Sequence, residues 1–253
     1  MEARRALVIE NGPDDPAGPL GDWLAGAGLQ LVVVRPYDGD DVPGSIDGYA
    51  AVVVLGGPQS AYDDGPIQGR PSWLPAVKSL LRAAVAGATP TLGVCLGGQL
   101  LAEATGGLVE RAKTGPVVGA ALVAKRDAAA RDPVFGGLPF TPDVLEWHYD
   151  EITELPPGAV LLAASPTCRH EAFRVGAAAW GVQFHIESTP EAVTAWARAS
   201  RPDLESRGVD VDAVLDHAVA VHAELEQVWR PVAERFAALA MERSEQPPVQ
   251  QAT

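Results

Sequence analysis

Cysteine is scarce in this sequence of 253 residues, which contains only Cys95 and Cys168. Two cysteines cannot build a disulfide framework, so we expect a cytoplasmic protein in which a free thiol can serve as a nucleophile. Long apolar runs are also lacking. No stretch approaches the roughly 18 apolar residues of a membrane-spanning helix, and no basic segment followed by an apolar one marks a signal peptide.

Positive charge is in deficit, with 19 Lys and Arg against 33 Asp and Glu and a net charge of −14. Such an acidic surface argues against nucleic acid or an anionic membrane as a partner. Neither a GxGxxG fingerprint nor a phosphate loop is present, so no cofactor is expected. His217 and His222 stand five apart rather than at the helical spacing of zinc ligands, so no metal site is expected either.

Short runs of Val, Leu and Ile alternate with helical patterns in the N-terminal part. Hydrophobicity that is continuous along a strand indicates burial on both faces, as in a parallel sheet. The rhythm predicts an α/β fold with a flavodoxin-like, doubly wound, mostly parallel sheet. The expected strands are Ala6–Ile9, Leu31–Val34, Val52–Leu55 and Thr91–Val94, and the expected helices are Leu20–Ala27, Leu74–Ala86 and Leu96–Ala104.

The middle of the chain, residues 107–184, has little helical periodicity and predicts an antiparallel extension of the sheet. The strands expected there are Val117–Val123, Val144–Trp147, Val160–Ala164, Ala172–Val175 and Ala179–Phe184. A helix over Glu191–Ser200 follows, with Thr189 as its N-cap and Pro190 at its first position.

An amphipathic pattern over Val211–Met241, interrupted at Pro231, predicts a C-terminal helical segment. It either packs on the domain or binds a partner. We therefore divide the chain into a domain of residues 1–202, a helical extension of residues 203–242 packed on it, and a polar, disordered tail of residues 243–253.

The segment Gly93-Val94-Cys95-Leu96-Gly97-Gly98-Gln99 joins a buried strand to a helix. A nucleophile on such a sharp turn is held in an exposed position, and small neighbours make the turn sterically feasible. Cys95 would stand at a helix N-terminus, where the dipole and free N–H groups favour a thiolate. The N–H of Leu96 is a candidate donor to an oxyanion.

A base for that nucleophile is found far downstream, in Gln183-Phe184-His185-Ile186-Glu187. With the period of two of a strand, His185 and Glu187 are expected to point to one side and Ile186 to the other. A carboxylate there can hold the imidazole tautomer while the other ring nitrogen faces the thiol. The loop Gly56-Gly57-Pro58, after the third strand, is expected at the same carboxyl edge of the sheet.

These three segments together resemble the class I glutamine amidotransferases, and most of all the glutaminase domain of GMP synthetase and its stand-alone relatives. The resemblance covers roughly residues 5 to 200. The family pattern is a Gly-Gly-Pro loop, then G-x-C-x-G-x-Q, then His-x-Glu. This chain departs from many relatives in having Ile186 where they have proline, and Tyr149 where they often have glycine.

The resemblance implies a role for each matching residue. Cys95 would form a γ-glutamyl thioester and release ammonia, His185 would be the general base and acid, and Glu187 its orienting group. The N–H groups of Gly57 and Leu96 would form the oxyanion hole. The implied substrate-binding residues are Gly56, Gln99, His148, Tyr149 and Asp150.

Three functions stay open from the sequence. The first is a glutaminase that passes ammonia to a separate synthetase, because the Ser-Gly-Gly-Val-Asp-Ser pyrophosphatase motif of a complete GMP synthetase is absent. The second is a stand-alone hydrolase of another γ-glutamyl compound, since the scissile γ-carbonyl is the same. The third is a binding module that has lost turnover.

Overall fold

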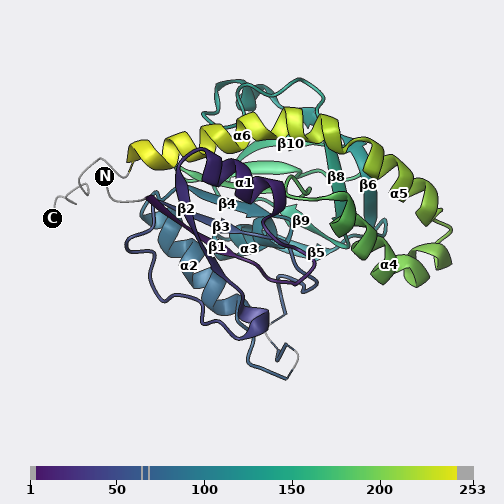
Figure 1. The fold of residues 1–253 in the computed structure, drawn as a ribbon, viewed down its shortest axis with the longest axis horizontal. Coiled ribbons are helices and arrows are strands. Elements are labelled where there is room, and N and C mark those ends of the chain that lie inside the picture. Colours follow the sequence, from purple (N-terminus) through teal and green to yellow (C-terminus); the bar gives the residue numbers. More distant parts are fainter. Residues whose placement is uncertain (1–3, 64, 68, 244–253) are drawn as a thin grey trace.

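An eight-stranded sheet runs through the centre of the molecule in the order β2-β1-β3-β4-β12-β11-β10-β7 (Figure 1). The computed structural model describes residues 4–63, 65–67 and 69–243. The first five strands of that order are parallel and the last three are antiparallel. Their bounds are β1 Arg4–Ile9, β2 Leu29–Val34, β3 Ala51–Val54, β4 Thr91–Val94, β7 Ala124–Lys125, β10 Val160–Ala164, β11 Ala172–Val175 and β12 Ala179–Val182.

Helices cover both faces of the sheet, which explains the continuous hydrophobicity of its parallel strands. Val8 of β1 belongs to the core cluster under α1 (Gly18–Gly26) and α6 (His222–Arg243). Its neighbours Leu7 and Ile9 belong to the opposite cluster, under α2 (Leu74–Ala86) and α3 (Leu96–Ala104). The sequence-based expectation of a flavodoxin-like α/β fold with a C-terminal helical segment is confirmed.

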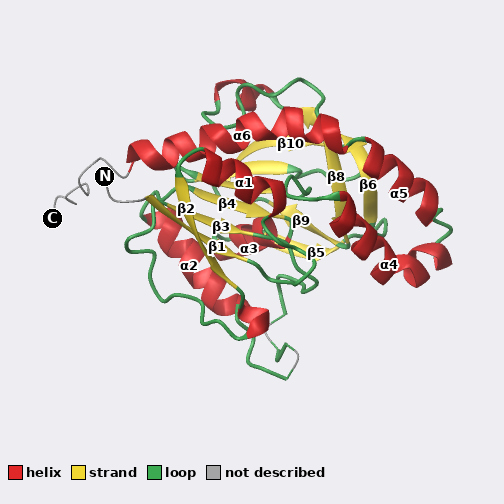
Figure 2. Cartoon of the chain, viewed as in Figure 1, coloured by secondary structure: helices red, strands yellow, loops and turns green. Residues whose placement is uncertain are grey.

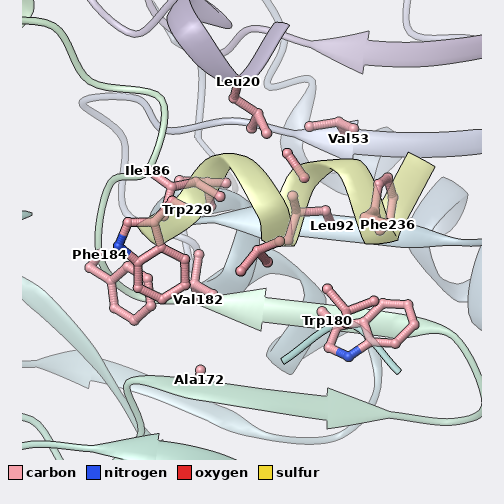
Figure 3. Packing of buried hydrophobic residues seen from close by; sticks show 14 of the residues in the cluster. Leu20, Val53, Leu92, Ala172, Trp180, Val182, Phe184, Ile186, Trp229 and Phe236 are labelled. Carbon is pink, nitrogen blue, oxygen red and sulfur yellow. The ribbon is translucent and has the colours of Figure 1, made fainter. Parts of the chain in front are cut away.

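Helix α6 forms part of the core, as Figure 3 shows. Trp229 and Phe236 are almost fully buried against the sheet. The ring of Phe236 meets Trp180 of β12 edge-on with centroids 6.2 Å apart, and Trp229 lies 4.8 Å from Phe184. Of the two expectations for this segment, packing on the domain is therefore the one that the described residues display.

The strands in the middle of the chain belong to three sheets, whereas the sequence predicted one antiparallel extension (Figure 2). Strands β7, β10 and β11 extend the main sheet, but two separate two-stranded sheets stand beside it. One pairs β5 (Leu108–Arg111) with β9 (Asp150–Glu154), and the other pairs β6 (Val117–Leu122) with β8 (Asp143–His148). Strands β5, β7 and β9 were not expected, because each is short and carries charged residues. Two short 3₁₀ helices span Pro36–Asp38 and Asp127–Arg131.

The predicted interruption of the C-terminal helix at Pro231 is wrong. The break falls at Val221, between α5 (Val211–Ala220) and α6, and Pro231 lies inside α6. The imidazole Nδ1 of His222 lies 2.7 Å from the carbonyl oxygen of Ala218. In a continuous helix that carbonyl would accept the backbone N–H of His222, so the side chain substitutes for the helical bond at the break.

Helix α4 (Pro190–Ser206) begins as expected, with the hydroxyl of Thr189 accepting the N–H of Ala192 and Pro190 at the first position. It is longer than expected and includes Pro202, so the proposed division after residue 202 falls within a helix. The expected tail, residues 243–253, lies outside the described residues except for the end of α6. None of the described helices has the length and apolar character needed to cross a membrane.

Candidate active site

Cys95 occupies the turn between β4 and α3 in a backbone conformation that is rare for a side-chain-bearing residue, with φ 50° and ψ −109°. Its N–H donates to the carbonyl of Val182 on the neighbouring strand at 2.9 Å, which holds the turn against the sheet. The turn also needs Gly97, because a Cβ there would lie 1.9 Å from the carbonyl oxygen of Val54. Strain of this kind is typical of functional sites and agrees with the sharp strand-to-helix turn that the sequence predicts over residues 93–99, which we call the elbow.

Two backbone N–H groups near the thiol are uncommitted. Among the described residues, the N–H groups of Leu96 and Gly57 donate to no backbone carbonyl in a turn, loop or cap. The side chain of Leu96 and the backbone of Gly57 are in close approach, since a Cβ on Gly57 would lie 3.1 Å from Leu96 Cδ2. Leu96 stands at the N-terminus of α3 and Gly57 in the loop after β3, and two such N–H groups suit a developing oxyanion.

His185 and Glu187 lie in a bend after β12 rather than on the strand, which ends at Val182. The expected strand geometry is therefore wrong, but the expected pairing is present. The Nδ1–H of His185 donates to Glu187 Oε1 at 2.7 Å, and both side chains are about 2% exposed. The other ring nitrogen, Nε2, makes no hydrogen bond to a described residue.

The pKa of the His185 imidazole is raised by its surroundings. Burial by itself would lower its pKa, but the charge of Glu187 and the neighbouring Cys95 outweigh that effect and raise the pKa well above 6.5. A histidine that favours its charged form beside a thiol stabilises the thiolate. It is also placed to hand a proton to a leaving group.

A cavity of about 470 Å³ opens over the thiol, and it is lined by Cys95, Leu96, Gly57 and His185. Of the expected substrate-binding residues, Gln99, His148, Tyr149 and Asp150 also line it. Gly56 is not in the lining but lies behind it, between Asp15 and His185. The structure thus brings the three sequence segments to one site. Among the described residues, no group of three or more His, Cys, Asp or Glu is arranged to hold a metal ion.

Near Gln99, the carboxylate of Asp150 holds several side chains of the cavity wall together. The carboxylate of Asp150 accepts hydrogen bonds from the hydroxyls of Ser60 and Tyr62 and lies 3.6 Å from Arg111. The guanidinium of Arg111 stacks 4.5 Å above the ring of Tyr149. The tyrosine therefore stays in the cavity wall, where a glycine would leave it open.

His148 turns its polar atoms away from the cavity. Its Nδ1–H donates to the carbonyl of Asp150 at 2.9 Å, and its Nε2 lies 3.1 Å from Glu146 Oε2. Burial lowers the pKa of His148 and raises those of Glu146 and its neighbour Glu171. The oxygens of these two carboxyls find no donor in the described residues unless the carboxyls keep protons, so this buried cluster is held together in its neutral form.

Three further residues of the site were not singled out by the sequence. The Nε2 of Gln183 lies 3.8 Å from Cys95 Sγ, and its carbonyl oxygen accepts from Gln99. The indole of Trp196 packs on His185 with ring centroids 4.4 Å apart. The carboxylate of Asp15 lines the cavity, and burial raises its pKa to about 6. Gln183 stood two residues from His185, but nothing in the sequence pointed to the other two.

The family model described as glutamine amidotransferase class-I matches residues 20–196 of this chain. That match takes in the elbow, the Gly-Gly-Pro loop and the His-x-Glu segment. The chain belongs to the class I glutamine amidotransferase family.

Several relatives of this family member are known. The glutamine amidotransferase-like protein YfeJ of Salmonella typhimurium is 31% identical over 75% of this chain and 78% of its own length. The glutamine-hydrolyzing GMP synthase subunit of Thermococcus kodakarensis is 43% identical, but over only 39% of this chain and 50% of its own length. Gamma-glutamyl peptidase 3 of Arabidopsis thaliana is 29% identical over 65% of each chain.

A solved structure shares the whole fold. The glutamine amidotransferase of Methylobacillus flagellatus superposes over 100% of both chains with a TM-score of 0.80 and 27% identity. Helices α5 and α6 of this chain thus fall within the matched length.

Proposed function

We propose that this protein hydrolyses the γ-amide bond of glutamine or of a closely related γ-glutamyl compound through a thioester on Cys95. The observation that carries the proposal is the convergence of the strained Cys95 elbow and the buried His185–Glu187 pair on one cavity. Membership of the class I family supports the same chemistry.

The reaction begins with the thiolate of Cys95 attacking the γ-carbonyl carbon. The N–H groups of Gly57 and Leu96 stabilise the resulting oxyanion. The C–N bond then breaks as the imidazolium of His185 gives its proton to the departing nitrogen, leaving a γ-glutamyl thioester and a free amine or ammonia.

Water completes the cycle. The neutral imidazole of His185 takes a proton from the water, whose oxygen attacks the thioester carbon. The C–S bond breaks, the new γ-carboxyl group loses its proton to solvent as glutamate leaves, and the thiolate of Cys95 again faces the imidazolium of His185. Glu187 keeps the ring in one tautomer and stabilises its charged form throughout.

The first test measures ammonia release from L-glutamine by the purified protein, with Cys95→Ala as the control. Release that disappears in the variant supports a glutaminase that works by itself. If the wild-type protein releases no ammonia from glutamine and forms no acyl-enzyme with any γ-glutamyl amide, the hydrolase proposal is wrong. A binding module would then be the remaining function.

Two more specific functions are compatible with this chemistry. Similarity to the Thermococcus GMP synthase protein favours a glutaminase that supplies ammonia to a separate synthetase. Similarity to a γ-glutamyl peptidase, and a cavity of about 470 Å³ that a free amino acid would only partly fill, favour a stand-alone hydrolase of a larger γ-glutamyl compound. The cavity is the more specific observation, because it belongs to this chain.

A further inference from the structure

The acidic residues that line the cavity fall into two groups with different charge partners. In the first group each carboxylate has a partner, since Arg111 lies beside Asp150 and Arg207 holds Asp203 at 2.9 Å. In the second group are Asp14 and Asp15, which also line the wall. Neither forms an ion pair with a cation in the described part of the chain.

Asp15 is buried beside the catalytic imidazole. It is only 8% exposed, and burial with no compensating hydrogen bond from a described residue raises its pKa to about 6, while the charge of His185 acts against that rise. Asp15 Oδ1 lies 2.9 Å, and His185 Cε1 3.3 Å, from the point that a Cβ on Gly56 would occupy. The carboxylate and the imidazole therefore both pack against the open face of Gly56, where a side chain would clash with Asp15.

The loop that carries Asp15 is fixed rather than free. The indole N–H of Trp196 donates to the carbonyl of Asp14 at 3.0 Å, while the same indole packs on His185. The N–H of Asp15 is bonded to the carbonyl of Gly12 at 3.2 Å. A buried carboxylate without a partner is costly, so a structure that holds one in place at a cavity wall favours a cationic ligand there.

The part of the cavity beside His185 receives the leaving group. His185 must protonate the departing nitrogen, so the atoms attached to that nitrogen extend past the imidazole, toward Asp15. The γ-glutamyl part is assigned to Gln99 and Asp150, the lining residues that the family resemblance gives as substrate-binding. Asp15 is therefore placed to contact what leaves and not what is transferred to Cys95.

Resting on the hydrolase function proposed above, we infer that Asp15 selects γ-glutamyl amides whose leaving amine carries a second, positively charged amino group. Such a substrate is a γ-glutamyl diamine or polyamine. The bond that breaks is the γ C–N bond, His185 gives its proton to the nitrogen of the departing diamine, and the distal ammonium remains paired with Asp15 until release. A leaving group that ends in a carboxylate, as in a γ-glutamyl amino acid, would meet a negative wall.

The experiment uses three substrates with the same four-carbon chain. They are the γ-glutamyl amides of 1,4-diaminobutane, n-butylamine and 4-aminobutyrate, which end in an ammonium, a methyl group and a carboxylate. We expect kcat/KM to fall in that order, with about tenfold between the cationic and the neutral substrate, as for one partly buried ion pair. Equal values for the three, or a preference for the anionic one, would overturn the inference.

Asp15→Asn and Asp14→Asn form a matched pair of variants. Both remove one negative charge from the same loop, but Asp14 is exposed and screened by solvent. Asp15→Asn should reduce the ratio of the cationic to the neutral kcat/KM by about tenfold, and Asp14→Asn by about twofold or less. A uniform loss on all three substrates in Asp15→Asn would show that Asp15 only positions His185, which contradicts a role in selection.

Failure of the inference can be told from failure of the function. Cleavage of all three substrates at one rate leaves the hydrolase standing and removes the preference for cations. Cleavage of none of them, nor of glutamine, removes both. The wild-type substrate series decides between these outcomes even if the Asp15 variant fails to fold.

Discussion

The indole of Trp196 packs on the imidazole of His185 with ring centroids 4.4 Å apart and an interplanar angle of 46°. Trp196 comes from α4 and His185 from the bend after β12, so a helix that lies outside the main sheet covers one side of the histidine that we propose as the general base and acid. It shields the ring from water and fixes its plane, and both effects matter for a group that must move protons.

Replacing Trp196 by alanine should therefore impair catalysis. We expect kcat/KM to fall by about tenfold, because the imidazole loses its packing partner and becomes hydrated. Trp196→Phe keeps a ring but loses the N–H that holds the carbonyl of Asp14, and should lose about threefold. Steady-state kinetics on both variants check this, and equal activity of the alanine variant and the wild type would contradict it.

Glu187→Gln should reduce the reactivity of Cys95 toward iodoacetamide. The charge of Glu187 helps to keep the pKa of His185 well above 6.5, and without it the pKa falls and less imidazolium faces the thiol at pH 7. A loss of one pKa unit would correspond to a rate of alkylation about tenfold lower. The rate is followed by mass spectrometry over pH 5 to 9.

Two controls accompany this measurement. Cys95→Ala gives the background from the buried Cys168, and Glu191→Gln removes an exposed carboxylate four residues away. If Glu191→Gln slowed alkylation as much as Glu187→Gln, the effect would come from net charge rather than from the pair.

Glu171→Gln should make stability less dependent on pH. In the unfolded chain Glu171 and Glu146 titrate near 4.5, whereas burial raises both pKa values in the fold. The stability that comes from their protonated forms is therefore fully present below pH 4.5 and is lost as pH rises through the raised values. A glutamine at 171 stays neutral and can still donate to Glu146.

We expect the Glu171→Gln protein to unfold at the same urea concentration as the wild type at pH 5. At pH 8 it should be more stable by about 1–2 kcal/mol. Glu226→Gln, on the exposed face of α6, is the matched control and should change neither value by more than about 0.5 kcal/mol. A wild-type stability that stayed level from pH 5 to 8 would refute the neutral cluster.

Local signals made part of the site predictable from the sequence. The elbow around Cys95 is contiguous, and its glycines and flanking strand and helix are encoded within a few residues. The expected contact between His185 and Glu187 is present although the strand assigned to them is not, because a bend after β12 can also bring residues two apart together. Contacts between residues that are close in the sequence could be predicted without knowing the exact backbone conformation.

The contribution of distant residues could not be predicted. Asp15 follows β1 and Trp196 belongs to α4, and only the folded chain places both beside His185. The break at Val221 depends on a side chain that replaces a helical hydrogen bond, which hydrophobic periodicity does not register. These features come from the packing of elements, and one sequence does not display that packing.

Helix α6 offers a final prediction, because its apolar face lies in the main core. Phe236 is fully buried and meets Trp180 edge-on, so Phe236→Ala should cost about 3–5 kcal/mol of unfolding free energy. Val219→Ala, at a side chain 41% exposed on α5, should cost less than about 0.5 kcal/mol. Urea unfolding of both variants measures the difference. If Phe236→Ala were as stable as the wild type, α6 would be a detachable segment, and its docking to a partner would again be the better account of the C-terminal helices.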